Sequence, residues 1–175
     1  MAAIPAPWGY VHVAVADRGV VACDSLTPPD AFAASIERRL HREVVTSPTQ
    51  LLDDAVAQIE AYLRGERRVF ELEIEIDDRP DWDRRVLAEV AGIPWGLVTT
   101  YGGIARAVER PGAARAVGGA VGRSPIGIVV PCHRVLAANG SLGGYGSDWS
   151  GSRRAGLDVK RELLAIEGIV VPTHD

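Results

Sequence analysis

The chain has 175 residues, a hydrophobic fraction of 47% and a formal net charge of −4. This length allows one domain or two small ones with an ordinary core, and the net charge alone argues against a dedicated polyanion binder. The charges are unevenly spread, however. Acidic residues concentrate between residues 70 and 83, whereas Arg and Lys outnumber Asp and Glu between residues 84 and 161. The second half can therefore present a basic face to a nucleic acid.

The N-terminus lacks a basic region followed by an apolar core, and no apolar run is long enough to cross a membrane. We therefore expect a cytoplasmic protein without a membrane partner. In such a reducing compartment, Cys23 and Cys132 are expected to be free thiols, with a disulfide between them as the minor alternative.

The first half predicts a small α/β domain over residues 1–78 with a short sheet. Residues 8–26 alternate apolar and polar side chains around Asp17-Arg18-Gly19, which is typical of a β-hairpin. A helix should run from Pro28-Pro29 to about Arg42, and the alternation in residues 69–76 predicts a further strand. Nothing in this half carries obvious chemistry.

A second helix of this half should begin at Ser47 and end at Gly65. Ser47 can cap it, Pro48 suits the first turn, and Gln50 can return the capping hydrogen bond. Apolar side chains then follow one helical face. Residues 77–80 are predicted to be the linker to a second domain.

The second domain, over residues 79–175, is predicted to be mostly helical. One helix should end near Gly92, a shorter one should follow a cap at Thr99 or Thr100, and a third should span residues 113–121 after the break at residues 110–112. Two short helices joined by a Pro-Gly turn suggest a winged-helix-like helix-turn-helix. The fold class is thus α/β (α+β).

The helix over residues 113–121 has an unusual composition. Gly118 and Gly119 each weaken a helix by roughly 1 kcal/mol, and with the neighbouring alanines they leave a surface almost without side chains. This bare surface permits either tight packing inside the protein or close approach to a DNA groove. Arg115 is the long side chain that projects from it.

The chemistry is expected around Cys132. Residues 126–130 resemble a buried strand, Pro131 interrupts it, and residues 135–142 should form a hairpin that turns at Asn139-Gly140. Cys132 therefore lies at a backbone break beside His133 and Arg134. A thiolate is a good nucleophile, and a nearby histidine can take up the thiol proton directly or through a water molecule.

The sequence Pro131-Cys132-His133-Arg134-Val135 resembles the active-site signature of the O6-alkylguanine-DNA alkyltransferases, also called methylated-DNA–protein-cysteine methyltransferases. Further matching segments occur in the family's order. They are residues 93–96, Tyr101, residues 114–120, Lys160 and residues 163–168. The resemblance is strong over about residues 80–168 and weak over the first half.

The resemblance implies direct reversal of DNA damage. The family flips O6-alkylguanine, and also O4-alkylthymine, out of the duplex and transfers the alkyl group to the cysteine, here Cys132. Flipping is physically needed because the target oxygen lies within the base-paired stack. The implied catalytic residues are Cys132, His133 as the base, Glu167 as its orienting carboxylate and Tyr101 as the proton donor to guanine N3.

The remaining implied site residues form two groups. Those expected at the DNA are Arg115, Ala114, Gly118, Gly119 and Ser124. Those expected at the substrate pocket are Val135, Val121, Tyr145, Lys160 and Trp149. The partner would be double-stranded DNA with an alkylated guanine.

The product would be a stable thioether, so each molecule should act once. No cofactor is required, and we expect a monomer. Some relatives hold a structural zinc ion in the N-terminal domain, but His12, Cys23 and His41 are too few and too irregularly spaced to predict one here. We therefore expect no metal.

The sequence departs from the family pattern at two places. Ser124-Pro125 replaces the usual Asn-Pro, and serine has one donor hydrogen and a shorter reach than asparagine. The loop over residues 146–155 is longer than usual. It is either a tolerated insertion or a segment in which Trp149 covers the pocket or Arg153 and Arg154 contact phosphate.

Three alternatives compete with alkyl transfer. A non-catalytic alkyltransferase-like protein would bind the lesion without a reactive cysteine, which the presence of Cys132 argues against. A Cys-His hydrolase would need an oxyanion hole and repeated turnover. A plain helix-turn-helix regulator would leave Cys132, Tyr101 and Glu167 without a purpose.

Overall fold

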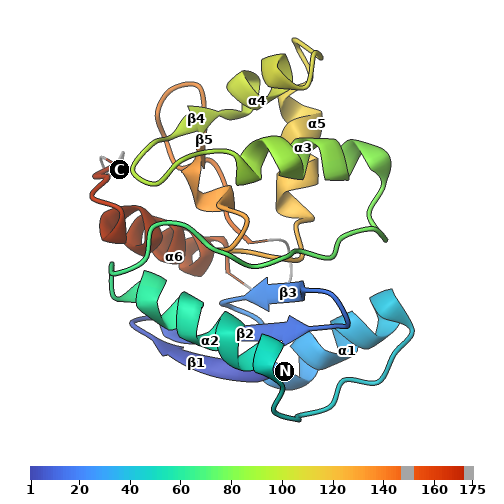
Figure 1. Ribbon diagram of the computed structural model, residues 1–175. Coiled ribbons are helices and arrows are strands. Elements are labelled where there is room, and N and C mark those ends of the chain that lie inside the picture. Colours follow the sequence, from blue (N-terminus) through green and yellow to red (C-terminus); the bar gives the residue numbers. More distant parts are fainter. Residues whose placement is uncertain (147–151, 172–175) are drawn as a thin grey trace. The chain divides into compact units, whose positions relative to one another are not determined.

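The computed structural model describes residues 1–146 and 152–171. By its internal contacts the chain forms two compact units, and each mixes helices with a small sheet, so the α/β (α+β) prediction is confirmed (Figure 1). Unit 1 comprises residues 1–78 together with residues 125–129, and unit 2 comprises the remainder. Residues 125–129 lie inside the predicted second domain but pack with unit 1.

The sheet of unit 1 has three antiparallel strands in the order β1 (Ala2–Ala6), β2 (Gly9–Val15) and β3 (Val20–Asp24). The predicted hairpin is β2–β3 and is confirmed. Strand β1 was not predicted. Its Pro5 is compatible with its position, because β1 is an edge strand and a proline there removes no ladder donor from the middle of the sheet.

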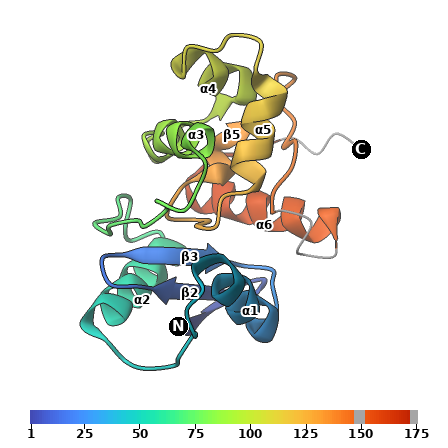
Figure 2. The same ribbon diagram turned by 90° about the vertical axis from the view of Figure 1, so that its right-hand side faces the viewer.

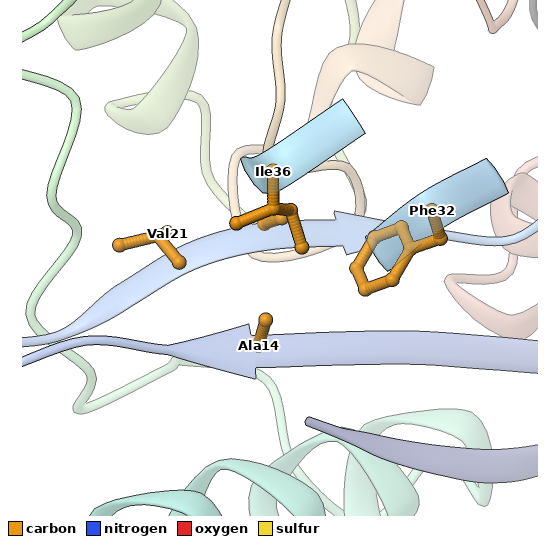
Figure 3. Packing of buried hydrophobic residues seen from close by; sticks show 5 residues of the cluster. Ala14, Val21, Phe32 and Ile36 are labelled. Carbon is orange, nitrogen blue, oxygen red and sulfur yellow. The ribbon is translucent and has the colours of Figure 1, made fainter. Parts of the chain in front are cut away.

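The helix predicted from Pro28-Pro29 to about Arg42 is present as α1 (Pro29–Leu40), and it packs on this sheet. Phe32 and Ile36 are buried on that helix and pack against Ala14 and Val21 of the strands (Figure 3). Phe32 and Ile36 are a helical turn apart on α1, which is the spacing that places apolar residues on one face.

Helix α2 (Gln50–Leu63) contacts β1 and β2 through its own buried side chains. The predicted cap at Ser47 is wrong by two residues. Thr49 is the N-cap, and its hydroxyl accepts a hydrogen bond from the backbone N–H of Leu52 at 3.1 Å. Threonine is also a favourable N-cap residue, so the motif contained two competing caps.

The predicted strands over residues 69–76 and 126–130 are wrong, because the two segments share the free edge of β3. Val20 exchanges backbone hydrogen bonds with Glu73 and Glu75 at 2.8 and 2.9 Å. Three residues further along the same strand, Cys23 exchanges hydrogen bonds with Pro125 and Gly127 at 2.9 and 2.7 Å. Each segment therefore contributes one isolated bridge rather than a strand.

Unit 2 contains most of the helices (Figure 2). They are α3 (Asp81–Ala91), α4 (Tyr101–Ala107), α5 (Ala114–Gly122), the short 3₁₀ helix η1 (Cys132–Arg134) and α6 (Arg153–Ile166). The predicted helices before residue 122 are confirmed, and α3, α4 and α5 contact one another. Consecutive helices α4 and α5 form the expected pair.

The predicted hairpin over residues 135–142 is only partly present. The turn exists, with the N–H of Ala137 donating to the Ser141 carbonyl at 2.9 Å. Strand β5 (Val135–Leu136), however, pairs in parallel with β4 (Thr99–Thr100) instead of with the residues after the turn. The backbone donors and acceptors of β5 are thus occupied by a segment distant in sequence.

Both cysteines are free, as predicted, and both are buried. A search of residues 1–146 and 152–171 finds no helix that is both long and apolar enough to span a membrane.

A substitution at Gly19 tests whether residues 73–75 occupy their part of the free edge of β3. A Cβ atom added there would lie 2.3 Å from the backbone oxygen of Glu73. We expect Gly19→Ala to displace residues 73–75 and to lower the free energy of unfolding by about 2 kcal/mol, the usual cost of overpacking. Chemical denaturation measures this. Gly122→Ala is the control, because its Cβ would meet nothing within 4 Å, and equal losses in both variants would contradict the arrangement.

Candidate active site

The backbone around Cys132 folds into η1, a single 3₁₀ turn that follows Pro131. The N–H of Cys132 donates to the Val130 carbonyl at 2.8 Å, and the N–H of Arg134 donates to the Pro131 carbonyl at 2.9 Å. Three residues complete one turn of such a helix, so its three side chains leave the backbone in different directions. All three are buried.

The thiol of Cys132 is enclosed and lies among polar groups. Its sulfur is 3.8 Å from the Val121 carbonyl oxygen at the end of α5. Burial raises the pKa of this thiol to about 11, although the hydroxyl of Ser124 and the charge of Lys160 both favour the thiolate. The resting cysteine therefore keeps its proton at neutral pH, and Ser124 contributes to the electrostatic surroundings of the sulfur.

The structure brings His133 and Glu167 together as predicted. Glu167 follows the last turn of α6, and its Oε1 lies 2.7 Å from Nε2 of His133. Both side chains are completely enclosed. Burial lowers the pKa of His133 despite the hydrogen bond to Glu167, and the charges of Arg134 and Lys160 lower it further. The ring is therefore neutral at pH 7, and with Nε2 facing the carboxylate, Nδ1 is the nitrogen that can take up a proton.

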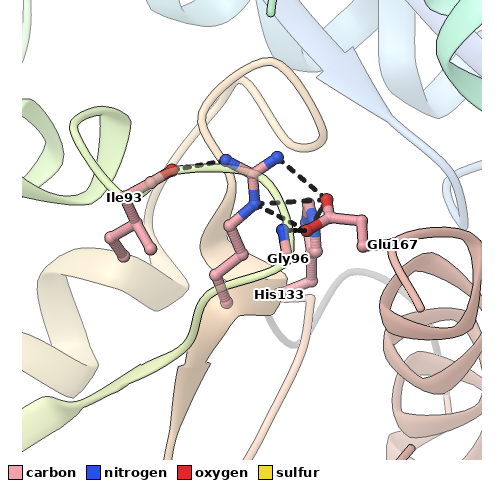
Figure 4. Close-up of polar contacts among 5 residues, drawn as sticks. Ile93, Gly96, His133 and Glu167 are labelled. Atoms are coloured by element: carbon pink, nitrogen blue, oxygen red, sulfur yellow. Dashed lines mark hydrogen bonds and ion pairs between the residues drawn. The ribbon is translucent and has the colours of Figure 1, made fainter. Parts of the chain in front are cut away.

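Arg134 is a site residue to which the sequence reasoning gave no role. Its Nε and Nη2 donate to the Glu167 carboxylate at distances between 2.9 and 3.1 Å, and its Nη1 donates to the Ile93 carbonyl (Figure 4). The N–H of Gly96 also reaches Oε2 of Glu167, at 3.2 Å. The place of Arg134 in the active-site signature indicated that it lies near the site. Its neighbours in the sequence did not show which group its side chain contacts.

Lys160, on the same helix as Glu167, holds the segment that follows Cys132. Its Nζ donates to the carbonyls of Val135, Leu142 and Gly144 at 2.5, 2.6 and 3.1 Å. Burial lowers its pKa to about 8. Lys160 is thus a backbone anchor with a charge near Cys132, and its place at the substrate pocket stays a prediction.

Tyr101 begins α4 and is half-buried. Burial raises the pKa of its hydroxyl, so it remains protonated at neutral pH, and the N–H of Gly144 lies within hydrogen-bonding reach of its oxygen. Gly143 has φ +73°, and a Cβ there would lie 3.1 Å from Cε2 of the tyrosine ring. Only glycine therefore fits comfortably at position 143.

The predicted DNA-contact residues of α5 have different surroundings. Arg115 is exposed, and Ala114 is half-buried at the start of the helix. The missing side chain of Gly118 faces the Tyr101 ring, and that of Gly119 faces the guanidinium of Arg123. The bare face thus has neighbours inside unit 2, and its contact with DNA stays a prediction.

Asp83 anchors the C-terminal end of α5 to α3. Its buried carboxylate accepts hydrogen bonds from Nε and Nη2 of Arg123 at 2.9 and 2.7 Å. A Cβ at Gly119 would lie 3.0 Å from Nη1 of Arg123, so the glycine leaves room for this side chain. No pattern in the sequence pointed to this pair.

For the other predicted pocket residues, the structure gives mainly their burial. Val121 and Val135 are buried, and Tyr145 is half-buried. Trp149 lies outside the described residues, as do the other residues of 147–151, half of the long loop. At the end of that loop, Arg153 donates to the Gly143 carbonyl at 3.1 Å. Within residues 1–146 and 152–171, no group of three or more His, Cys, Asp or Glu side chains could hold a metal ion.

Comparison with known proteins identifies both parts of the chain. Residues 81–169 match the family described as 6-O-methylguanine DNA methyltransferase, DNA binding domain, and residues 2–76 match its ribonuclease-like domain. A methylated-DNA–protein-cysteine methyltransferase of Mycolicibacterium paratuberculosis is 47% identical over 113 residues, which are 65% of this chain and 63% of that relative. The chain thus matches less than two thirds of that relative's length. A Methanosarcina acetivorans protein of the same name is 43% identical over 66% of this chain and 68% of its own.

Solved structures agree over more of the chain. The crystal structure of Mycobacterium tuberculosis OGT in complex with DNA is 34% identical, covers 94% of this chain and 90% of its own, and has a TM-score of 0.75. An O6-methylguanine-DNA methyltransferase of Pyrococcus kodakaraensis is 26% identical over 91% of this chain and 98% of its own, with a TM-score of 0.63. These similarities extend through the N-terminal half.

The environment of the Cys132 thiol predicts its reactivity. Because its pKa is raised to about 11, the thiolate fraction, and with it the rate of reaction with iodoacetamide, should rise about tenfold per pH unit from pH 7 to 10. Ser124→Ala removes a group that stabilises the thiolate and should slow the reaction about threefold. Mass spectrometry in a Cys23→Ala background measures both rates, with Ser47→Ala as the exposed-serine control. A plateau below pH 9, or no effect of Ser124→Ala, would contradict this description.

Proposed function

Because the chain belongs to the 6-O-methylguanine DNA methyltransferase family, we propose that it repairs DNA by moving an alkyl group from guanine O6 to Cys132. The proposal extends to O4-alkylthymine. The observation that carries it is the 2.7 Å contact between Glu167 and His133, the residue that follows the free, buried Cys132. A neutral imidazole oriented by a carboxylate is the arrangement that lets a histidine accept a proton from a neighbouring nucleophile.

In the proposed reaction, protons move among Cys132, His133, Tyr101 and the damaged guanine. The Cys132 thiol gives its proton to Nδ1 of His133, through a bridging water, and the sulfur attacks the alkyl carbon. An S–C bond forms as the O6–C bond breaks, and its electron pair passes to guanine. Tyr101 donates a proton toward guanine N3, so guanine leaves as a neutral base. The thioether that remains is not hydrolysed under mild conditions, so one molecule repairs one lesion.

Burial of the thiol has a consequence for selectivity. A cysteine with a pKa near 11 is mostly protonated at rest and resists general electrophiles. Its activation depends on His133 and on a substrate placed in line with the sulfur, as proximity effects in catalysis require. An extrahelical base supplies that placement, and free alkylating agents do not.

Contact with DNA is assigned to α5. Its small residues permit close approach to a groove, and the exposed Arg115 can fill the space that the flipped base leaves. One chain supplies all of these side chains, so we propose that a monomer is sufficient.

Intact-mass analysis after incubation with a duplex that contains one O6-methylguanine tests the proposal. We expect a mass gain of one methyl group that maps to Cys132 and saturates at one per chain, because the thioether is not reversed. Cys132→Ser should gain nothing, and Cys23→Ser, the matched control, should behave as the unmodified chain.

Two outcomes would contradict alkyl transfer. Repeated turnover with an unmodified Cys132 would indicate a hydrolase. Cellular protection against alkylation by a Cys132→Ala variant would instead indicate a lesion-binding protein without catalysis.

A further inference from the structure

Arg134 is a buried cation that no step of the proposed reaction uses. Its side chain is 7% exposed, and it contacts both oxygens of Glu167 as well as the Ile93 carbonyl. A buried guanidinium is costly unless it is paired. A fork of two donors aimed at one carboxylate is the geometry that fixes a carboxylate in place.

Arg134 and His133 use the same carboxylate. Oε1 of Glu167 receives His133 at 2.7 Å and Nη2 of Arg134 at 2.9 Å, whereas Oε2 receives Nε of Arg134 at 2.9 Å and the Gly96 N–H at 3.2 Å. Two oxygens offer about four acceptor positions. Arg134 Nε also lies 3.1 Å from Oε1, so the arginine contacts both oxygens and, with the Gly96 N–H, holds the carboxylate in its orientation toward the imidazole.

The charges around His133 also depend on Arg134. The groups that face the ring are Lys160 of α6, Glu167 directly after that helix, and Arg134 of η1. With Arg134 present, the positive charge of its guanidinium compensates the negative charge of the Glu167 carboxylate. Without it, an uncompensated carboxylate would lie 2.7 Å from a buried imidazole, and electrostatic attraction in such an enclosed site strongly favours the imidazolium.

We propose that Arg134 is a positioning residue that neutralises and orients Glu167, so that His133 rests without a proton on Nδ1 and can accept one from Cys132. An imidazole that already carried this proton could not act as a base. The role in transfer rests on the proposed function. The effect on the protonation of His133 does not, so the two can be tested separately.

The test is an NMR titration of the His133 ring, assigned with a His133→Gln variant, in the unmodified chain and in Arg134→Met. We expect the titration midpoint to rise by more than one pH unit in Arg134→Met. On the acid side of the pH profile, the single-turnover transfer rate depends on a neutral His133. We expect the midpoint of this acid limb to move to higher pH by the same amount. Arg134→Lys retains a positive charge and should restore the midpoint to near its original value, which a purely space-filling role would not predict.

Arg123→Met is the matched control, because it removes an arginine from a carboxylate pair of the same unit that does not touch Glu167. It should leave the His133 midpoint unchanged. If Arg134→Met does not fold, Arg134→Gln makes the same test, since glutamine is neutral and can still donate to Glu167. An unchanged midpoint in the folded neutral variant would overturn the role of Arg134. A shifted midpoint in a protein that transfers no alkyl group would overturn the proposed function alone.

Discussion

The surroundings of Cys132 depend on the contact between the carboxylate of Glu167 and the turn η1. Glu167 follows the last turn of α6, where the helix dipole disfavours a negative charge, so the carboxylate needs donors from elsewhere. It receives them from His133, Arg134 and the Gly96 N–H.

Lys160 precedes Glu167 by seven residues, two helical turns, and therefore lies on the same face of α6. From that face it holds the backbone after η1. One helix thus fixes both the turn that carries the thiol and the segment that follows it.

Burial has opposite effects on the groups in this cluster. It raises the pKa of Cys132 to about 11 and lowers the pKa of both Lys160 and His133. Burial therefore favours the neutral form of each group, although Lys160, with a pKa of about 8, still carries most of its charge at pH 7. For a reagent that acts once, a thiol that stays protonated until its substrate arrives avoids loss by side reactions. The enclosure of the site is thus consistent with the single turnover in our proposal.

Local patterns predicted much of this fold, whereas competition between distant segments did not show in the sequence. The β2–β3 hairpin, α1 and the α4–α5 pair follow from alternation, helical spacing and a Pro-Gly break. Residues 69–76 alternate as well as any strand, but residues 125–127 occupy part of the same β3 edge. The Cys132 and His133 positions came from the active-site signature and Glu167 from the matching segment over residues 163–168, and the structure brings His133 and Glu167 into contact. The role of Arg134 required coordinates, because adjacency in a 3₁₀ turn does not say which partner a long side chain reaches.

The most direct test of the account is Glu167→Gln, compared with Glu162→Gln on the exposed side of the same helix. An amide keeps the shape of the carboxylate but leaves the buried Arg134 without its counter-ion. We expect Glu167→Gln to lose about 3 kcal/mol of unfolding free energy and to transfer an alkyl group from O6-methylguanine DNA about 100-fold more slowly in single-turnover kinetics. Glu162→Gln should match the unmodified chain. A Glu167→Gln variant with unaltered stability and transfer rate would contradict the central role of this carboxylate.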